Sequence, residues 1–208
     1  MKKAFLFVVL ATLLLSATRA QAQLGFHAGY APQTFSISAN SITADMSAGR
    51  MHGFFGGVHY SRSVLGGLGF TAAAQIRLNS ATVSTEEYIT QDWQFLADVP
   101  LLLNFGFTVA NKLTLGAFAG PMLSYGISYT QKTTDAETFE VITTTDRYGT
   151  SVPAVALKRF EAAAVGGVFL KFRSFALFGG YRLGLNDIDM MSDCTTKAKG
   201  FFVGIGVN

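Results

Sequence analysis

Residues 93–129 read WQFLADVPLLLNFGFTVANKLTLGAFAGPMLSYGISY, and this stretch decides the fold. From 93 to 108 and again from 113 to 129, every second position holds an apolar side chain. The positions between them are mostly small, polar or charged. An alternation with period two over about 16 residues predicts a β-strand. The stretch therefore predicts two long antiparallel strands joined by a turn at 109–112. Strands with one apolar face and one face of small or polar residues are typical of a transmembrane β-barrel.

The same alternation returns in six other parts of the chain, at about 24–38, 52–62, 68–79, 160–172, 175–185 and 200–207. With the central pair this makes eight strands. The predicted fold class is all-β, as an eight-stranded antiparallel up-and-down transmembrane β-barrel. One barrel domain is expected to span residues 23–208.

The lengths of the connections alternate along the chain. Short turns are predicted at 63–67, 109–112 and 173–174, and longer polar connections at 39–50, 80–92, 130–159 and 186–197. Outer-membrane barrels have short periplasmic turns and longer extracellular loops, so the pattern favours this class of protein. Within the longest connection, residues 138–143 predict a short strand that extends a hairpin beyond the membrane.

The N-terminus has the features of a secretory signal peptide. Lys2 and Lys3 precede an apolar run from Ala4 to Ala17, and Ala20-Gln21-Ala22 supplies small residues for a signal peptidase. Residues 1–22 are therefore predicted to be a cleaved signal peptide, with cleavage after Ala22. The apolar run, of about 14 residues, is too short to serve as a membrane anchor.

Composition excludes several classes of function. The chain carries 16 basic and 13 acidic residues, but Lys2, Lys3 and Arg19 belong to the signal peptide, so the mature chain has no net charge. No nucleic-acid partner is expected. Cys194 is the single cysteine, so no internal disulfide forms. The three histidines, His27, His52 and His59, are too scattered to predict a metal site.

Five charged residues lie within the predicted strands, each on the small or polar face of its strand: Arg77, Asp98, Glu161, Lys171 and Arg182. A basic residue facing lipid near mid-membrane costs about 2–4 kcal/mol, so these residues are expected inside the barrel. We expect them to pair there as a structural network that fixes strand register, because an unpaired buried charge is very costly. A proton path, an ion path or a catalytic site is the functional alternative.

Aromatic residues and prolines add two further expectations. Aromatic side chains on the apolar face are predicted to form interfacial girdles, namely Trp93, Tyr30, Tyr60, Tyr125, Tyr129 and Tyr181. Pro100 and Pro121 lie within strands although proline cannot donate to the ladder, so a bulge or kink is expected at one or both.

Three segments resemble a known family, the small outer-membrane β-barrel domain described as porin-family or PorT-like. They are Phe95–Leu103 (FLADVPLLL), Leu115–Pro121 (LGAFAGP) and Gly180–Leu185 (GYRLGL). The resemblance extends over the mature chain and would account for both prolines. It implies an outer-membrane location and, for most members, no assigned chemistry. The barrel-assembly machinery is an expected partner.

The expected function is that of an outer-membrane protein with a structural or interaction role. Its partners would be outer-membrane lipids and an envelope protein bound through the extracellular loops. Eight strands leave no open channel, so a diffusion pore is not expected. No catalytic residue, cofactor or metal ligand is predicted. Three alternatives remain: a lipid-modifying hydrolase using His59 with Ser61, or His52; an accessory component of a secretion system; and a soluble lipocalin-like barrel that binds an apolar ligand.

Overall fold

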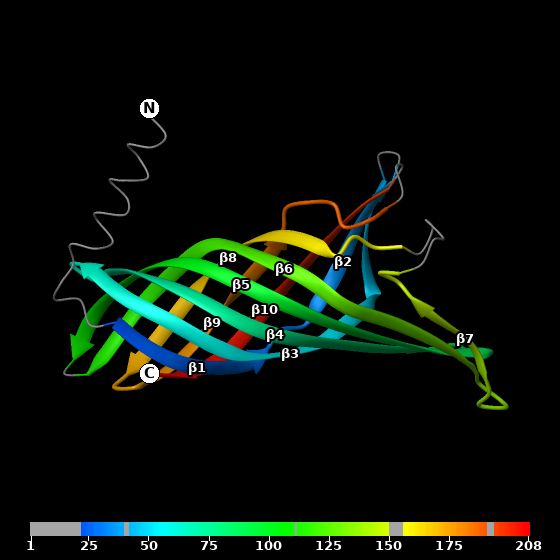
Figure 1. Cartoon of the computed structure of the whole chain (residues 1–208), viewed down its shortest axis with the longest axis horizontal. Helices are drawn as coiled ribbons and strands as arrows, with labels where there is room; N and C mark the ends of the chain where they lie inside the picture. Colours follow the sequence, from blue (N-terminus) through cyan, green and yellow to red (C-terminus); the bar gives the residue numbers. More distant parts are fainter. Residues whose placement is uncertain (1–21, 40–41, 111, 150–155, 191–193) are drawn as a thin grey trace.

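The computed structural model describes residues 22–39, 42–110, 112–149, 156–190 and 194–208 (Figure 1). Residues 1–21, which include nearly all of the expected signal peptide, lie outside the described residues. Its cleavage after Ala22 stays a prediction. The strands are β1 (Ala22–Tyr30), β2 (Gln33–Ala39), β3 (Ile42–Leu65), β4 (Leu68–Ser84), β5 (Tyr88–Ala110), β6 (Leu113–Asp135), β7 (Val141–Asp146), β8 (Phe160–Phe172), β9 (Phe175–Gly184) and β10 (Cys194–Val207).

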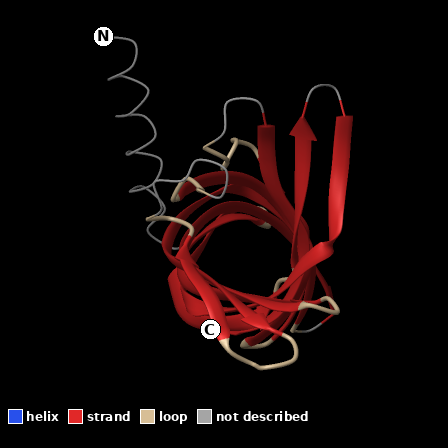
Figure 2. Cartoon of the chain, turned by 90° about the vertical axis from the view of Figure 1, so that its right-hand side faces the viewer, coloured by secondary structure: helices blue, strands red, loops and turns tan. Residues whose placement is uncertain are grey.

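The strands close into a ring of eight, which confirms the predicted all-β, up-and-down antiparallel fold (Figure 2). β1 and β2 together form the first strand of the ring, interrupted at Ala31-Pro32. Around the ring follow β3, β4, β5, β6, β8, β9 and β10, each antiparallel to its neighbours. Pairing of β10 with β1 and β2 closes the ring, so this ring has no free edge.

The seam between the first and last strands keeps one register along its whole length. Phe26 of β1 pairs with Val207 of β10, and Thr34 of β2 pairs with Lys199 of β10. Both pairs belong to the same register, so the alignment of β10 does not change across the break. On its other side the first strand shifts register against β3 between Gln33 and Phe35. The break at Ala31-Pro32 therefore leaves the seam itself continuous.

Short turns join the strands at one end of the barrel, here called the turn end. Gly66 and Gly67, both with positive φ, connect β3 to β4, as a two-residue type I′ hairpin requires. Arg173-Ser174 connects β8 to β9, with Phe172 paired to Phe175, as predicted. The turn between β5 and β6 is shorter than predicted, because β5 continues to Ala110.

The opposite end of the barrel is here called the loop end. The strands there continue beyond the residues in which apolar side chains alternate. Residues 80–92, expected as a polar connection, are mostly strand, since β4 runs to Ser84 and β5 starts at Tyr88. The expected polar segment 39–50 is likewise largely part of β3. The short strand predicted at 138–143 is present about three residues later, as β7, because 138–140 belong to the turn before it. β7 pairs with the outer part of β6 and extends that sheet beyond the ring (Figure 1).

One β-bulge changes the face of an aromatic residue. The register between β5 and β6 shifts between Phe95 and Leu96, where Ile127 is the extra residue in β6. Ile127 and Ser128 both face outward, and Tyr129 turns inward and is 3% exposed. The prediction that Tyr129 belongs to the outer girdle is therefore wrong, because a bulge shifts every following side chain to the opposite face.

The two prolines interrupt the pairing of β5 locally but do not shift its register. The β5–β6 register is the same before and after them, with Val99 opposite Leu123 and Leu103 opposite Ala119. The expectation is met in part. A bulge is absent at both prolines, and the bulge in β6 lies at Ile127, but β5 lacks partners in β4 at Val99-Pro100 and in β6 opposite Pro121.

The two faces of the ring differ sharply in chemistry. The alternate apolar residues point outward, and Leu103, Val168 and Ile205 are 65%, 65% and 62% exposed. Trp93, Tyr60, Tyr125 and Tyr181 also lie on this outer face, as predicted. Among the described residues no helix is long and apolar enough to cross a membrane.

Candidate functional site

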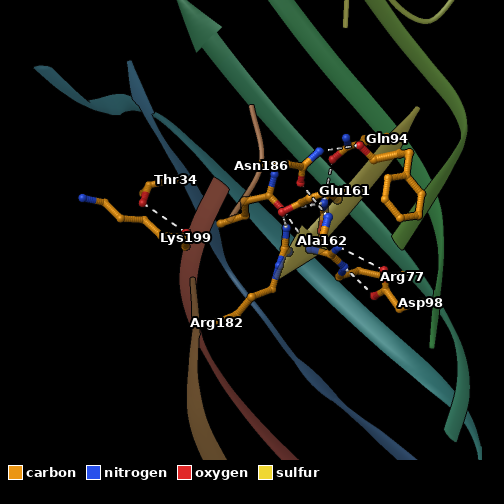
Figure 3. A network of polar contacts seen from close by, with 12 residues as sticks. Thr34, Arg77, Gln94, Asp98, Glu161, Ala162, Arg182, Asn186 and Lys199 are labelled. Atoms are coloured by element: carbon orange, nitrogen blue, oxygen red, sulfur yellow. Dashed lines mark hydrogen bonds and ion pairs between the residues drawn. The ribbon is translucent and has the colours of Figure 1, made fainter. Parts of the chain in front are cut away.

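Four of the five predicted charged residues meet in one layer across the barrel interior (Figure 3). Arg77 comes from β4, Asp98 from β5, Glu161 from β8 and Arg182 from β9. All four are less than a tenth exposed. Their strands carry them inward because each belongs to the parity opposite the apolar outer face.

Arg77 and Asp98 form a bidentate ion pair. Arg77 donates from Nε to Asp98 Oδ2 at 2.9 Å and from Nη2 to Oδ1 at 3.2 Å. Gln75 Nε2 also donates to Oδ2 at 3.2 Å. The planar guanidinium matches a carboxylate in this geometry, which makes the pair stronger and more directional than a single contact.

The second pair, Arg182 with Glu161, is joined to the first by a neutral amide. Arg182 Nη2 donates to Glu161 Oε1. Gln33 Oε1 accepts from Arg77 Nη1 at 2.7 Å and from Arg182 Nη1 at 2.9 Å. These five side chains, Gln33, Arg77, Asp98, Glu161 and Arg182, are called the charged layer below. Two arginines and two carboxylates leave the layer without net charge.

Neutral side chains extend the layer toward the loop end. Asn79 Nδ2 donates to Gln94 Oε1 at 2.8 Å, and Gln94 Nε2 donates to Tyr148 Oη at 2.7 Å. Tyr148 follows β7 and lies over Gly126, where a Cβ atom would overlap its ring. A residue from a loop therefore reaches into the barrel and joins the network.

Lys171 lies apart from the charged layer. It is half-buried near the turn end of β8, and its Nζ donates to Gln23 Oε1 at 2.7 Å. Among the described residues, no carboxylate forms an ion pair with it. The expectation of one network of five charges thus differs from the structure, because Lys171 is ten positions along β8 from Glu161.

Two loop segments pack against inward-facing side chains at the loop end. Leu157 and Ile188 are buried there against Met51, Tyr129 and Ala198. Backbone hydrogen bonds tie the segments together, from Lys158 N to Ile188 O at 2.8 Å and from Ile188 N to Thr196 O at 3.0 Å. Segments 156–158 and 186–190 are called the cap below. With the charged layer beneath it, the cap leaves the loop end filled by side chains.

Asp187 holds the cap in place, and this makes the cap sensitive to acid. Its Oδ1 accepts from the backbone N–H groups of Asp189 and Thr196 at 3.0 and 2.8 Å, and its Oδ2 accepts from Lys158 at 3.0 Å. Partial burial raises the pKa of Asp187, but these hydrogen bonds outweigh burial and leave the pKa below the ordinary value of an aspartate.

Lowering the pH below about 4 is therefore expected to loosen the cap. A carboxylate with a lowered folded-state pKa contributes stability above its unfolded pKa of about 3.9, and that contribution is lost as the pH falls through the folded value. The amide signals of Ile188 and Thr196, followed by NMR from pH 6 to 3, should shift together. Asp187→Asn should show the loosened cap already at neutral pH.

Asp135 provides the matched control for this titration. Its Oδ1 accepts from the backbone N–H groups of Glu137 and Thr138 in the turn between β6 and β7, which also lowers its pKa. Asp135→Asn should alter that turn alone. A cap that titrates identically in the wild type and in Asp187→Asn would contradict the assignment.

Between the charged layer and the turn end, phenylalanine rings lie flat against the barrel wall. Each ring covers a glycine of a neighbouring strand, at a position where a Cβ atom would overlap the ring. The five pairs are Phe55 on Gly29, Phe118 on Gly167, Phe169 on Gly116, Phe178 on Gly204 and Phe202 on Gly180. This arrangement leaves a cavity of about 530 Å³ in the lower half of the barrel.

The histidines do not form a catalytic arrangement with serine. The Ser61 hydroxyl is hydrogen-bonded to Thr71 Oγ1 at 2.7 Å, whereas His59 Nε2 contacts Asn208 Oδ1. His52 is on the outer side and bonds to the Tyr30 hydroxyl at 2.6 Å. No cluster of three or more histidine, cysteine, aspartate or glutamate side chains suited to a metal ion occurs among the described residues.

Comparisons with known proteins give structural likeness only. No family model matches the chain, and no curated protein matches it. The chain is similar to Ail, the attachment invasion locus protein of Yersinia pestis, in a complex with the heparin analogue sucrose octasulfate. The TM-score is 0.44 at 8% identity, covering 89% of this chain and 98% of that one. It is also similar to Neisserial surface protein A (NspA), with a TM-score of 0.41 and 14% identity over 90% and 98% of the two chains. The fold assignment depends on the strand pairing, and neither likeness bears on function.

Proposed function

We propose that the chain is an integral protein of a Gram-negative outer membrane, with a structural or interaction role and no open pore. The observation that carries this proposal is the inversion of the two faces. Large apolar side chains cover the outside of the ring, whereas Arg77, Asp98, Glu161 and Arg182 are buried and paired inside. A soluble barrel would bury the apolar face, because exposed patches of this size are rare on soluble monomers.

The filled loop end supports a role other than diffusion. The cap and the charged layer occupy the interior that a channel would need, and eight strands enclose only enough space for side chains or one small ligand. The outer face would then contact lipid, and the loop end would contact any protein partner. The sheet that extends there exposes Phe139, Val141 and Ile142 at 72%, 52% and 53%.

The route to the membrane completes the proposal. Residues 1–22 would direct export, and the barrel-assembly machinery would insert the mature chain. The resemblance to the porin-family or PorT-like domain supports this location. An enzymatic role has less support, because Ser61 bonds to Thr71 instead of to His59.

Fractionation tests the proposal directly. We expect the mature chain in the outer-membrane fraction, with a gel mobility that changes on boiling, as a folded barrel unfolds. Release with the periplasmic fraction, without detergent, would instead indicate the soluble lipocalin-like alternative.

Orientation is tested by labelling single cysteines in a Cys194→Ser background. Thr138→Cys lies at the loop end, in the turn between β6 and β7, and Lys112→Cys lies at the turn end. In intact cells a membrane-impermeant maleimide should label Thr138→Cys and leave Lys112→Cys unlabelled until the outer membrane is permeabilised. The reverse pattern would contradict the proposed topology.

A further inference from the structure

The cavity in the lower half of the barrel has one closed end and one open end. Its inner end meets Arg77, Asp98 and Arg182 of the charged layer, and its mouth is formed by turn-end residues such as Ser63, Gly67 and Thr108. At about 530 Å³ it is in the range of pockets that hold a small organic ligand. The barrel is therefore a cup that opens at the turn end.

The hollow follows from how the interior is built. Phe118, Phe169, Phe178 and Phe202 would fill the barrel if their rings projected toward its axis. Each instead covers a glycine on the adjacent strand, so the ring becomes part of the wall. Ala73 of β4 also lines the cavity, and its side chain adds only a methyl group to the interior. The sequence thus lines the space with flat apolar surfaces and leaves the centre empty of side chains.

The lining of the cavity is mostly apolar in the middle, where His27 is hydrogen-bonded to Gln75, and becomes polar at the mouth. The phenylalanine rings and Leu102 line the middle, and Thr71, Asn104 and Lys171 lie nearer the mouth. Among the described residues that line the cavity, Asp98 has the one acidic side chain, and it is paired with Arg77. The Lys171 ammonium has three donors, and Gln23 accepts from one of them. Lys171 thus places a basic group near the mouth of the cavity, with no ion pair to an acidic group in the part of the chain that the structure describes.

We propose that this cavity binds a single-chain anionic amphiphile, with its acyl chain between the phenylalanine rings and its head group at Lys171. An acyl chain is thin and flexible enough for an apolar cavity enclosed by eight strands. The charge of Lys171 selects an anionic head over a neutral or cationic one. Binding itself needs only the barrel; that the mouth opens to the periplasm rests on the proposed function.

Calorimetry of decanoate with the full chain in nanodiscs tests the site, with empty nanodiscs as the blank. Ala73→Phe should fill the cavity and weaken binding at least tenfold. Ala74→Phe is the matched control, because the neighbouring side chain faces outward and is exposed. It adds the same ring to the lipid-facing side and should leave binding unchanged.

The head group is tested with Lys171→Gln. Loss of a charge-assisted hydrogen bond should weaken decanoate binding about tenfold and leave 1-decanol binding within twofold. Decanoyl-lysophosphatidylglycerol, used in place of decanoate, distinguishes a lysophospholipid from a free fatty acid. Saturable binding of either one that Ala73→Phe weakens supports the site.

Two results would overturn the inference. One is that the titrations of decanoate and of decanoyl-lysophosphatidylglycerol are both indistinguishable from those of empty nanodiscs, and the other is equal affinity of Ala73→Phe and Ala74→Phe. Each protein is first checked for a heat-dependent gel shift, which reports the closed barrel independently of any ligand. Failure of ligand binding in a protein that retains the shift would reject the site and leave the outer-membrane proposal standing.

Discussion

Replacing Asp98 with alanine is expected to lower the free energy of unfolding by about 3–5 kcal/mol, because the charge of Arg77 would remain buried without a partner. Arg77 is 2% exposed, and two of its nitrogens donate to Asp98. The other carboxylate of the layer, Glu161, is held by Arg182. Guanidinium unfolding in phospholipid vesicles, followed by the fluorescence of Trp93, the single tryptophan, measures the loss.

An exposed ion pair provides the control for this substitution. Lys158 contacts Asp187 at 3.0 Å, but the two side chains are 47% and 28% exposed. Lys158→Ala should cost about 0–1 kcal/mol. The double variant Arg77→Met/Asp98→Leu should recover much of the stability, because an apolar pair removes both charges. A single Asp98→Ala variant as stable as Lys158→Ala would show that the layer is hydrated or unpaired.

Placing arginine at Leu103 is expected to destabilise the barrel in a bilayer by about 2–4 kcal/mol. Leu103 is 65% exposed near the centre of the apolar stripe of β5, where the proposed location puts it against hydrocarbon. On a soluble protein the same surface substitution would change stability by no more than about 0.5 kcal/mol. Unfolding from vesicles, again followed by Trp93, separates these two outcomes.

Ile142→Arg is the matched control for the lipid-facing position. Ile142 is 53% exposed on β7, outside the ring. It should tolerate arginine within about 0.5 kcal/mol. Equal effects of Leu103→Arg and Ile142→Arg would argue that the apolar band does not meet lipid.

The strands and their faces could be predicted because alternation is a local property. Each residue of a strand points opposite to its neighbours, so Arg77 and Asp98 could be placed inward from their own segments alone. Tyr129 was placed wrongly because alternation carries no sign of an inserted residue. The bulge at Ile127 depends on the partner strand β5, which a reading of one segment does not contain.

The loop end was the least predictable part of the fold. Pairs such as Thr82 with Gln91 and Val83 with Thr90 form regular ladder outside the apolar band. Outside the apolar band a strand can carry polar residues on both faces, and such a composition predicts loops instead of strands. The cap escaped prediction for another reason. Leu157 and Ile188 meet from separate loops, and neither lies in a periodic segment.

Neutral members of the interior were missed although a signal was present. Gln33, Asn79 and Gln94 all share the inward parity of their strands, but a neutral side chain on that face carries no cost that would single it out. Only the structure shows Gln33 bridging the two arginines. The cavity could not be predicted either, because the sequence gives each phenylalanine but not which glycine lies beside its ring.

The continuous seam between β10 and the first strand has a consequence for how the protein folds. It joins residues as distant as Phe26 and Val207, so its formation requires the largest loop closure in the chain. Gln33, beside that seam, accepts from arginines on β4 and β9, strands that come together around the bridge only when the sheet closes. In an unclosed sheet each arginine could keep the carboxylate of its neighbouring strand, Asp98 or Glu161, but would lack the shared acceptor. Completion of the ring and neutral burial of its ions should therefore occur as one cooperative event, late in folding.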